Sequence, residues 1–480
     1  MKSEDAERGN VLWMNSEGKG QAKMLRGEHV RALNMCAFSL SAFVFAFILF
    51  AAPISAHSTI HKAESTDSHQ FTLEIYGNAN EDDTIDMRDV TYIKLVIFRK
   101  KPETELCDAN YDGRISMLDV VQTKLIIVGK EGELTFIDSY NKTVTVKKPI
   151  NRIVVASPRA ALAMLRSIGV EENRIVGVES LIQSSGGEYG VNHKIFFPEY
   201  QDKPTVGTVW HPDVEKILSL NPDCVFLIAM PGLRGATTVD DAADALKSAG
   251  IPVLRFWCGV YDRDVIREIR MLGFIFNKRE RAEEFIRWRE EFMNIIRERV
   301  EKISEEDKPK VYFETGFGAY YTGGEYITNI EFCGGKTIFP EVTESTQVDP
   351  EAVVERNPDV IIKVASPYAT GPGVTGYDLD ADDITKIKEV RDEIMNRPEL
   401  KNVNAVKNGR VYVISSYIVG YGPADEGTGF LQKLYMAKWL HPELFKDLDP
   451  KAIHQEYLTR FQGLDIDLDE KGVFVYPEPS

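Results

Sequence analysis

The sequence predicts an α/β fold in which two Rossmann-like α/β lobes are joined by one long helix and preceded by a small all-α domain. A repeated phrase predicts the lobes: Glu-x₅-Asn-Pro-Asp begins at Glu215 and again at Glu351. In each copy a short helix must stop before the proline, and an apolar run typical of a buried strand follows. A separate observation predicts the long helix: the stretch 278–303 contains no Pro or Gly and has apolar residues at helical spacing.

The long helix separates the two lobes. At 1.5 Å per residue, about 26 helical residues span roughly 40 Å, the height of a domain. We therefore expect a first lobe at 134–277, a connecting helix at 278–306 and a second lobe at 307–480.

Composition restricts the class of function. The chain has 480 residues, 43% of them hydrophobic, and a formal net charge of −17, so we expect no nucleic-acid partner. It contains no Gly-x-Ser-x-Gly elbow, phosphate loop, dinucleotide fingerprint or His pair at metal spacing. These observations predict a protein that is not an enzyme, with a chelatase-like activity as a minor alternative.

The amino terminus indicates export. A polar region, 1–34, precedes an apolar segment, 35–56, which is either a cleaved signal peptide or a retained anchor, and a Ser/Thr-containing linker follows at 57–70. We expect the protein at the outer face of the cytoplasmic membrane or at the cell surface. Cys107, Cys224, Cys258 and Cys333 are too scattered for a disulfide framework. Free buried thiols are expected, with a Cys224–Cys258 bridge left open.

Two twelve-residue loops, 78–89 and 108–119, carry oxygen-bearing side chains at positions 1, 3, 5, 9 and 12, and an apolar helical stretch follows each. A hard cation such as calcium takes 6–8 oxygen ligands, and the seventh residue supplies a backbone carbonyl. The predicted ligands of the two loops are Asn78, Asn80, Asp82, Thr84, Asp86 and Asp89, and then Asp108, Asn110, Asp112, Arg114, Ser116 and Asp119.

The segment 71–133 resembles a dockerin, a module of two calcium loops each followed by a helix. The resemblance implies two bound calcium ions and a cohesin-bearing partner that docks at the tenth and eleventh loop positions, here Met87-Arg88 and Met117-Leu118. These residues depart from the Ser/Thr pairs common in cellulosomal dockerins, so both an unknown surface cohesin and a purely intramolecular role stay open. Asn78 replaces the opening aspartate and Asp83 the turn glycine of the first loop, which predicts weaker calcium binding there.

From about Thr143 to Gly463 the chain resembles the helical-backbone substrate-binding proteins of ABC importers for iron-siderophores, haem and cobalamin. The resemblance is carried by the repeated phrase, by Asn151-Arg-Ile-Val-Val-Ala-Ser-Pro, by Ala405-Val-Lys-Asn-Gly-Arg-Val-Tyr-Val and by Trp439-Leu-His-Pro-Glu-Leu-Phe. It implies a metal-chelate ligand held between the lobes and delivery to a membrane permease. It also implies that Glu215 and Glu351 meet arginines of the permease.

Strand ends locate the expected ligand contacts, since open α/β sheets bind ligands at the carboxyl ends of their strands. Aromatic rings suit a large chelate, and Arg159 and Arg234 suit its negative charge. The acidic stretch 371–383 is expected to be a solvated loop. The predicted ligand contacts are Ser157, Arg159, Trp210, His211, Trp257, Tyr320, Tyr321, Tyr368, Tyr417 and Tyr421.

The sequence therefore predicts an exported receptor that captures a metal chelate (iron-siderophore, haem or corrinoid) for an ABC permease. The alternative is an adhesion or scaffold protein that is tethered through the dockerin-like module and binds a macromolecule.

Overall fold

The computed structural model describes residues 71–183, 193–229, 236–257, 262–323, 326–342, 345–419 and 429–479. The chain divides into two units, 1–65 and 66–480, and the second contains all of these residues. No helix within the described ranges is long and apolar enough to cross a membrane. Several predictions lie outside the described residues, namely those on 1–70, Arg234, Cys258 and Tyr421.

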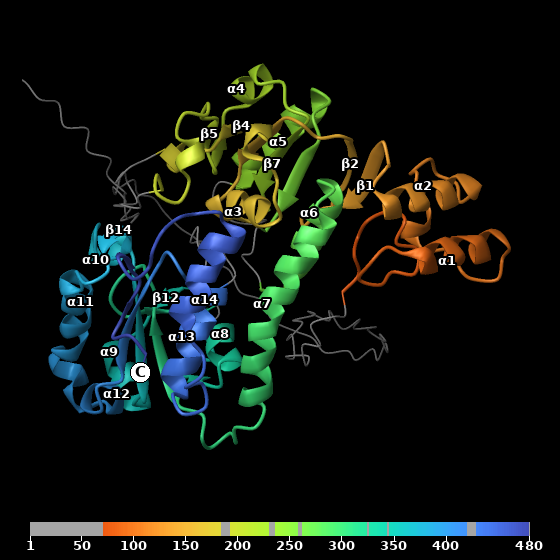
Figure 1. Cartoon of the computed structure of the whole chain (residues 1–480). Helices are drawn as coiled ribbons and strands as arrows, with labels where there is room; N and C mark the ends of the chain where they lie inside the picture. The colour runs from red at the N-terminus through yellow and green to blue at the C-terminus, as the bar shows by residue number, and fades with distance from the viewer. Residues whose placement is uncertain are drawn as a thin grey trace, which may run out of the picture. The chain divides into compact units, whose positions relative to one another are not determined.

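The first lobe is built on a parallel sheet with strand order β4-β3-β7-β8 (Figure 1). Successive residues of these strands face two different cores, because side chains alternate across a sheet. Val155 and Phe226 belong to the larger core, whereas Val154 and Val225 belong to a smaller one. The elements of this lobe are β3 (Ile153–Ala156), α3 (Arg159–Ser167), β4 (Ile175–Val178), β5 (Gly207–Thr208), β6 (His211–Pro212), α4 (Val214–Ser219), β7 (Cys224–Ile228), α5 (Ala236–Ser248), β8 (Val253–Phe256) and α6 (Asp262–Ile275).

The second lobe repeats this construction with strand order β11-β9-β13-β15-β17, in which only the last pair is antiparallel. The elements are β9 (Lys310–Glu314), β10 (Tyr321–Thr322), α8 (Tyr326–Phe332), β11 (Lys336–Thr337), β12 (Thr346–Gln347), α9 (Pro350–Arg356), β13 (Val360–Ala365), α10 (Pro367–Thr370), β14 (Gly376–Asp380), α11 (Thr385–Met395), α12 (Asn404–Lys407), β15 (Val411–Ser415), α13 (Phe430–Leu440), α14 (Pro450–Glu456), β16 (Lys471–Val473) and β17 (Val475–Tyr476).

Both copies of the repeated phrase form a short helix and then a strand, α4 with β7 and α9 with β13. The prediction of helix, turn and buried strand is confirmed at both places. The acidic stretch 371–383 was expected to be a solvated loop, and this was wrong in part. It contains β14, which pairs antiparallel with β16, a strand formed by residues near the carboxyl terminus.

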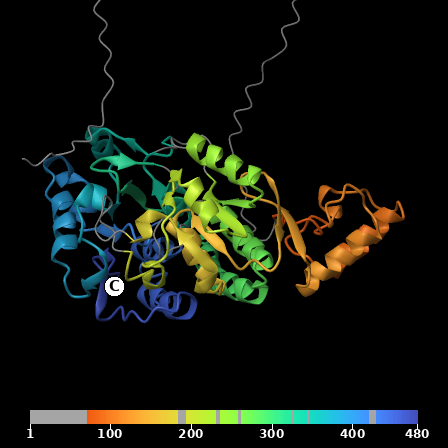
Figure 2. The same cartoon turned by 90° about the horizontal axis from the view of Figure 1, so that it is seen from above.

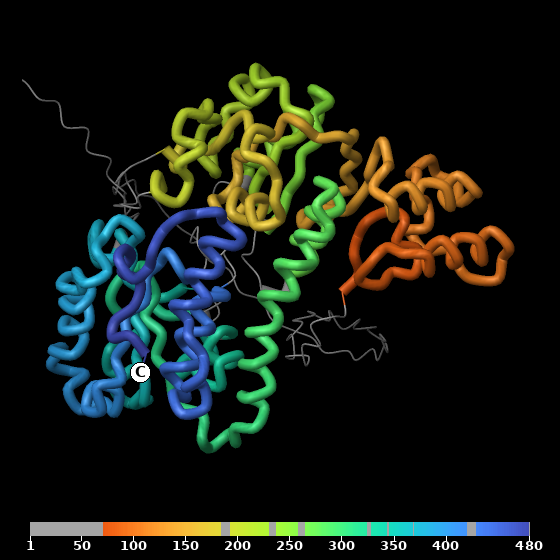
Figure 3. Tube along the Cα trace, viewed as in Figure 1, coloured from red at the N-terminus to blue at the C-terminus, as the bar shows by residue number. Residues whose placement is uncertain are grey.

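The connecting helix α7 (Arg279–Val300) confirms the predicted long helix, which is visible as a continuous green segment in Figures 1 and 3. Its aromatic residues pack on the carboxyl-terminal part of the second lobe. The Phe285 ring lies 4.8 Å from the Phe461 ring, and Trp288 lies 5.2 Å from Phe430. The amide of Gln462 also donates to Ala163 O in α3, so the carboxyl-terminal segment packs on the first lobe.

The segment preceding the lobes contains α1 (Met87–Ile97), α2 (Met117–Val128) and the hairpin β1 (Glu133–Ile137) and β2 (Thr143–Lys147). Figure 2 shows this segment in orange. We call residues 71–133 the loop module. It shares a core with the first lobe, because Leu73 and Ile75 belong to the same apolar cluster as Phe136, Ile153 and Phe256.

Candidate ligand-binding site

The carboxyl edge of the first sheet brings together two residues that the sequence singled out. Ser157 follows β3 directly and is fully buried, and Arg159 is the first residue of α3. The N-cap residue of this helix, Pro158, makes no side-chain capping hydrogen bond. The N-terminus of α3 therefore directs its partial positive charge and its arginine toward the same edge.

Two buried titratable residues that the sequence analysis missed lie close to Arg159. Glu179 follows β4 directly and is fully buried, and His193 is 1% exposed. One carboxylate oxygen of Glu179 accepts from Leu181 N at 2.7 Å, but its Oε1 and the Nδ1 of His193 are buried without a hydrogen-bond partner. Such groups are costly to bury unless something pairs with them.

The charges of this cluster depend on its burial. Burial raises the pKa of Glu179 to about 7, against a smaller opposing effect from Arg159. Burial, with a further contribution from Arg159, lowers the pKa of His193 to about 2, so the imidazole stays neutral. We call Arg159, Glu179 and His193 the first-lobe cluster. The sequence signal that could have identified Glu179 is its position directly after β4, because the carboxyl ends of parallel strands meet at one edge of the sheet.

The cluster lies near the contact between the lobes. Three residues after His193, the ring of Phe196 lies 5.5 Å from Tyr377 of the second lobe. Ile195 and Tyr377 also line a common surface hollow. The residues that follow His193 therefore face the second lobe.

The other first-lobe predictions have different surroundings. Trp210 is half-buried against the smaller core, and His211 is exposed in β6, where it pairs with Thr208 of β5. Trp257 is half-buried, and its backbone N–H donates to Glu268 at 2.7 Å. Trp210 and Trp257 combine packing with partial exposure, whereas His211 contributes no packing.

In the second lobe, a buried ion cluster fixes the loop that follows β9. Glu314 receives both terminal nitrogens of Arg397, at 2.7 and 3.0 Å, and the ammonium of Lys363 at 3.0 Å. Lys363 also donates to Thr315 O at 3.1 Å and to Gly318 O at 3.0 Å, and Ser366 Oγ donates to Gly316 O. The backbone of residues 315–318 is therefore held by three separate side-chain contacts.

This loop presents a different aromatic ring from the one predicted. Tyr320 is buried in the core with Tyr312 and Phe339, its hydroxyl donates to Glu399, and its φ is +61°. Packing in this core leaves little of the Tyr320 ring exposed to a ligand. Phe317, which the sequence analysis missed, is 63% exposed between two glycines, and Tyr321 is half-buried.

The remaining second-lobe predictions follow β13 and β15. Tyr368 lies in α10, after the N-cap residue Ser366. Tyr417 is buried, and its ring lies 5.7 Å from the Tyr377 ring, so this packing leaves little of it exposed to a ligand. Burial of Tyr320 and Tyr417 was not predictable from composition, because an aromatic residue after a strand suits a core and a cleft equally well.

Glu215 and Glu351 occupy matching positions in the structure. Each is exposed and stands in the first turn of its helix, two residues after an N-cap aspartate. The side chain of Asp213 accepts from Lys216 N, and that of Asp349 accepts from Glu351 N. Both glutamates are therefore available on the surface, one on each lobe.

The predicted calcium loops form their expected helices but are not alike. No group of three or more His, Cys, Asp or Glu side chains is arranged to hold a metal ion within the described ranges. In the second loop, Asp119 is buried and accepts from Asn110 N and Ser116 N, while Asp108 accepts from Asp112 N and Gly113 N. Burial, with the charge of Asp108 adding to it, raises the pKa of Asp119.

The fold and the match along the sequence define the class of protein. The chain belongs to the periplasmic binding protein family, whose profile matches residues 154–418. Molybdate-binding protein MolA of Haemophilus influenzae is 21% identical over 339 residues, which cover 68% of this chain and 89% of MolA.

Solved structures agree on the fold. MolA bound to molybdate matches with a TM-score of 0.52 and 20% identity over 68% of this chain and 98% of MolA. The TroA-like periplasmic binding protein FepB from Veillonella parvula matches with a TM-score of 0.57 and 22% identity over 71% of this chain and 98% of FepB. These relatives are solute-binding proteins rather than enzymes. The family match begins after the loop module, whose resemblance to a dockerin stays a prediction.

Proposed function

We propose that this chain is an extracytoplasmic substrate-binding protein of an ABC importer, and that its ligand is an anionic, metal-containing small molecule. The first-lobe cluster is the observation that carries the proposal. Arg159 and the uncapped N-terminus of α3 supply positive charge at the edge where this fold class binds ligands. The buried, unpartnered atoms of Glu179 and His193 supply polar groups that a bound molecule would satisfy.

Two ligand classes meet this description. One is a metal oxyanion, which agrees with the similarity to molybdate-binding MolA. The other is a metal chelate that carries a negatively charged group, such as a ferric siderophore, haem or a corrinoid, which the exposed Phe317 ring and the half-buried Trp210 would suit. The shared requirement is negative charge next to Arg159.

The test is thermal unfolding of the full chain with molybdate, haemin, cobalamin and ferric siderophores, in calcium throughout. A ligand that binds only the folded state at a hundred times its dissociation constant adds about 2.7 kcal/mol. A rise in Tm with one of these ligands identifies the ligand class, either a metal oxyanion or a metal chelate. Arg159→Met should weaken that ligand by about tenfold or more, because a charge-assisted hydrogen bond contributes about 1.5–3 kcal/mol. Unchanged Tm with all of them contradicts the proposal.

We further propose that the second loop of the module, 108–119, binds one calcium ion. The side chains of this loop carry the oxygen donors that calcium prefers. Gly113, the sixth residue, has φ of +85°, as the sharp turn of such a loop requires, and Asp108, Asp112 and Asp119 form no salt bridge with a Lys or Arg of the described chain. Asp108, Asn110, Asp112, Ser116 and Asp119 would hold the ion, with the carbonyl of Arg114. Bound calcium would neutralise these carboxylates and stabilise the module.

The adhesion alternative is favoured by one observation. Met87, Met117 and Leu118 are exposed at the tenth and eleventh loop positions, where the dockerin resemblance places a cohesin-bearing partner. Binding of a purified cohesin domain to the full chain, with loss of binding for Leu118→Asp, would support this partner. Binding of a macromolecule together with no small-molecule affinity would favour the adhesion role over import.

A further inference from the structure

The two acidic loops of the module share a register but diverge in their backbone. Their fourth residues, Glu81 and Tyr111, have nearly equal φ values of 57° and 55°. At the sixth position Gly113 has φ of +85°, whereas Asp83 is not among the residues with positive φ. The first loop therefore lacks the turn that directs the carbonyl of the seventh residue toward an ion.

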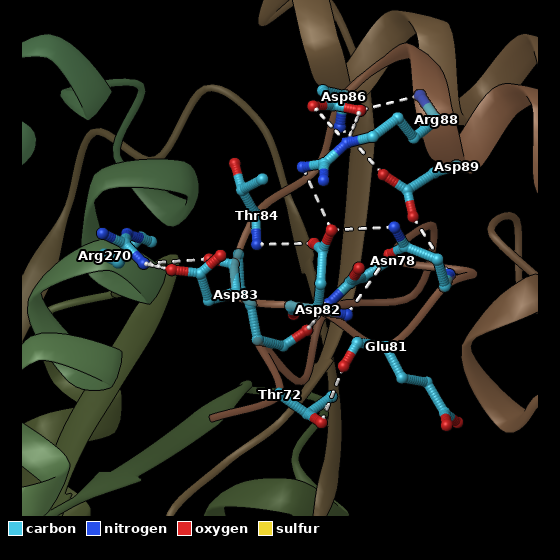
Figure 4. A network of polar contacts seen from close by, with 12 residues as sticks. Thr72, Asn78, Glu81, Asp82, Asp83, Thr84, Asp86, Arg88, Asp89 and Arg270 are labelled. Atoms are coloured by element: carbon cyan, nitrogen blue, oxygen red, sulfur yellow. Dashed lines mark hydrogen bonds and ion pairs between the residues drawn. The ribbon is translucent and has the colours of Figure 1, made fainter. Parts of the chain in front are cut away.

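Asp83 is instead bound by an arginine of the first lobe. Nη1 of Arg270 in α6 donates to the carboxylate of Asp83 at 2.8 Å and to its backbone carbonyl at 3.0 Å (Figure 4). The same guanidinium contacts Glu283 of the connecting helix α7 at 2.5 and 3.1 Å. Arg270 therefore joins the loop to α6 and to α7 at once.

A second arginine lies within the first loop itself. The guanidinium of Arg88 contacts Asp82 at 3.0 Å and Asp86 at 2.9 Å, which are the carboxylates of the fifth and ninth positions (Figure 4). Leu118 stands at the matching place in the second loop. Arg88 thus pairs with two carboxylates of the first loop, whereas no Lys or Arg among the described residues forms a salt bridge with the carboxylates of the second loop.

The opening residue also behaves differently in the two loops. Asn78 is fully buried, and its amide donates to Leu73 O at 2.8 Å and to Asp82 O at 2.6 Å. Its Oδ1 is buried without a hydrogen-bond partner. Asp108, in contrast, offers a carboxylate.

Further contacts fix the module beside this loop. Arg267 of α6 binds Glu74 at 2.6 Å, and the guanidinium of Arg270 lies over the Phe71 ring, 5.4 Å from its centre. Leu73 and Ile75 lie in the core of the first lobe. The module is therefore packed on the lobe rather than held by a flexible tether.

We propose that the two loops have different roles. Loop 108–119 holds the only calcium ion of the module. The carboxylates of loop 78–89 pair instead with Arg88 and Arg270, and Arg270 fixes the module to α6 and α7; we call this arrangement the clamp. The ion-binding half rests on the calcium site proposed above. The clamp half rests on the contacts of Arg88 and Arg270 alone.

Calorimetric titration of the full chain with calcium chloride, after treatment with EDTA, tests the ion count. We expect about one equivalent for the wild type, one for Asp82→Asn, and a loss of affinity of tenfold or more for Asp112→Asn. Two equivalents, or loss of binding in Asp82→Asn, would overturn the assignment. The absence of any binding would contradict the calcium site itself, and it would leave the ligand test with molybdate and the chelates unaffected.

Thermal unfolding in EDTA tests the clamp without an ion. Arg270→Met and Asp83→Asn should each lower Tm by a few degrees, and the double variant should lower it little beyond Arg270→Met alone, because Asp83 and Arg270 share one ion pair. Arg99→Met, at an exposed arginine of the same module, is the control and should leave Tm unchanged. Additive effects of the two substitutions, or no effect of Arg270→Met, would overturn the clamp.

Discussion

Arg397 and Glu314 form a two-pronged ion pair inside the second lobe, with N···O distances of 2.7 and 3.0 Å. Burial alone would raise the pKa of Glu314, but the hydrogen bonds from Arg397 and the charges of Lys363 and Arg397 lower it. Tyr320 N also donates to this carboxylate at 3.0 Å. The pair therefore keeps a charge in the core and fixes the start of a loop at the ligand edge.

Removing one member of this pair should be costly. Arg397→Met leaves the carboxylate of Glu314 with less compensation, and breaking a buried pair in this way costs about 3–5 kcal/mol. Lys388→Met is the control, because Lys388 and Asp392 form an exposed i,i+4 pair at 2.5 Å, and exposed pairs of this kind contribute little to stability. Urea unfolding measures both. Equal losses in the two variants would show that the buried pair has no special weight.

Glu179 should give the stability of the first lobe a defined pH dependence. Its folded pKa of about 7 exceeds the ordinary value of 4.5, so the folded state binds more protons between these values. Stability is then lost as pH rises from about 4.5 to 7, by on the order of 3 kcal/mol. Glu179→Gln removes this effect. The variant should gain stability relative to the wild type from pH 5 to pH 8 in urea unfolding, and parallel pH profiles would contradict the assignment.

Phe317 should contribute to ligand affinity but not to stability. Its ring is 63% exposed, and an aromatic contact contributes about 0.5–1.5 kcal/mol. Phe317→Ala should therefore weaken a chelate by roughly twofold to tenfold, with a change in unfolding free energy within about 0.5 kcal/mol. Phe98→Ala is the matched control, since Phe98 is 69% exposed in the loop module. If both variants bind equally to the wild type, the ring of Phe317 faces no ligand.

Local sequence signals predicted much of the fold. Proline after Asn221 and Asn357 ended the helices α4 and α9, and the absence of Pro and Gly gave α7. These features depend on neighbours in the chain. The pairing of β14 with β16 was not predictable, because Gly376 and Val473 are almost a hundred residues apart.

The site was less predictable than the fold. Strand-end reasoning placed Ser157 and Arg159 at the carboxyl edge of the first sheet, yet it passed over Glu179, which directly follows a strand and shares that edge. It also named Tyr320 and not Phe317 as a ligand contact, because the sequence does not show which of the two rings is buried in the core. The docking of Asp83 on Arg270 was equally hidden, since it joins residues 187 positions apart.

Glu215 and Glu351 should act in delivery and not in capture. Both are exposed in the first turn of matching helices, one on each lobe, and exposed charges of this kind steer and orient a partner of opposite charge. In a transport assay with the reconstituted permease, the double variant Glu215→Gln/Glu351→Gln should lower uptake by tenfold or more. Its ligand affinity should stay within about twofold of the wild type, because neither carboxylate belongs to the first-lobe cluster.

The matched control is Glu355→Gln, which removes an exposed charge one turn further along α9. Uptake should be unchanged in this variant, because the first copy of the repeated phrase has Ser219 at the position equivalent to Glu355, so no carboxylate recurs there. A single variant at Glu215 or Glu351 should lower uptake less than the double variant, since one lobe would still engage the permease. If Glu355→Gln lowers uptake as strongly as Glu351→Gln, the effect reflects the total charge of the second lobe, and the two glutamates are not specific docking points.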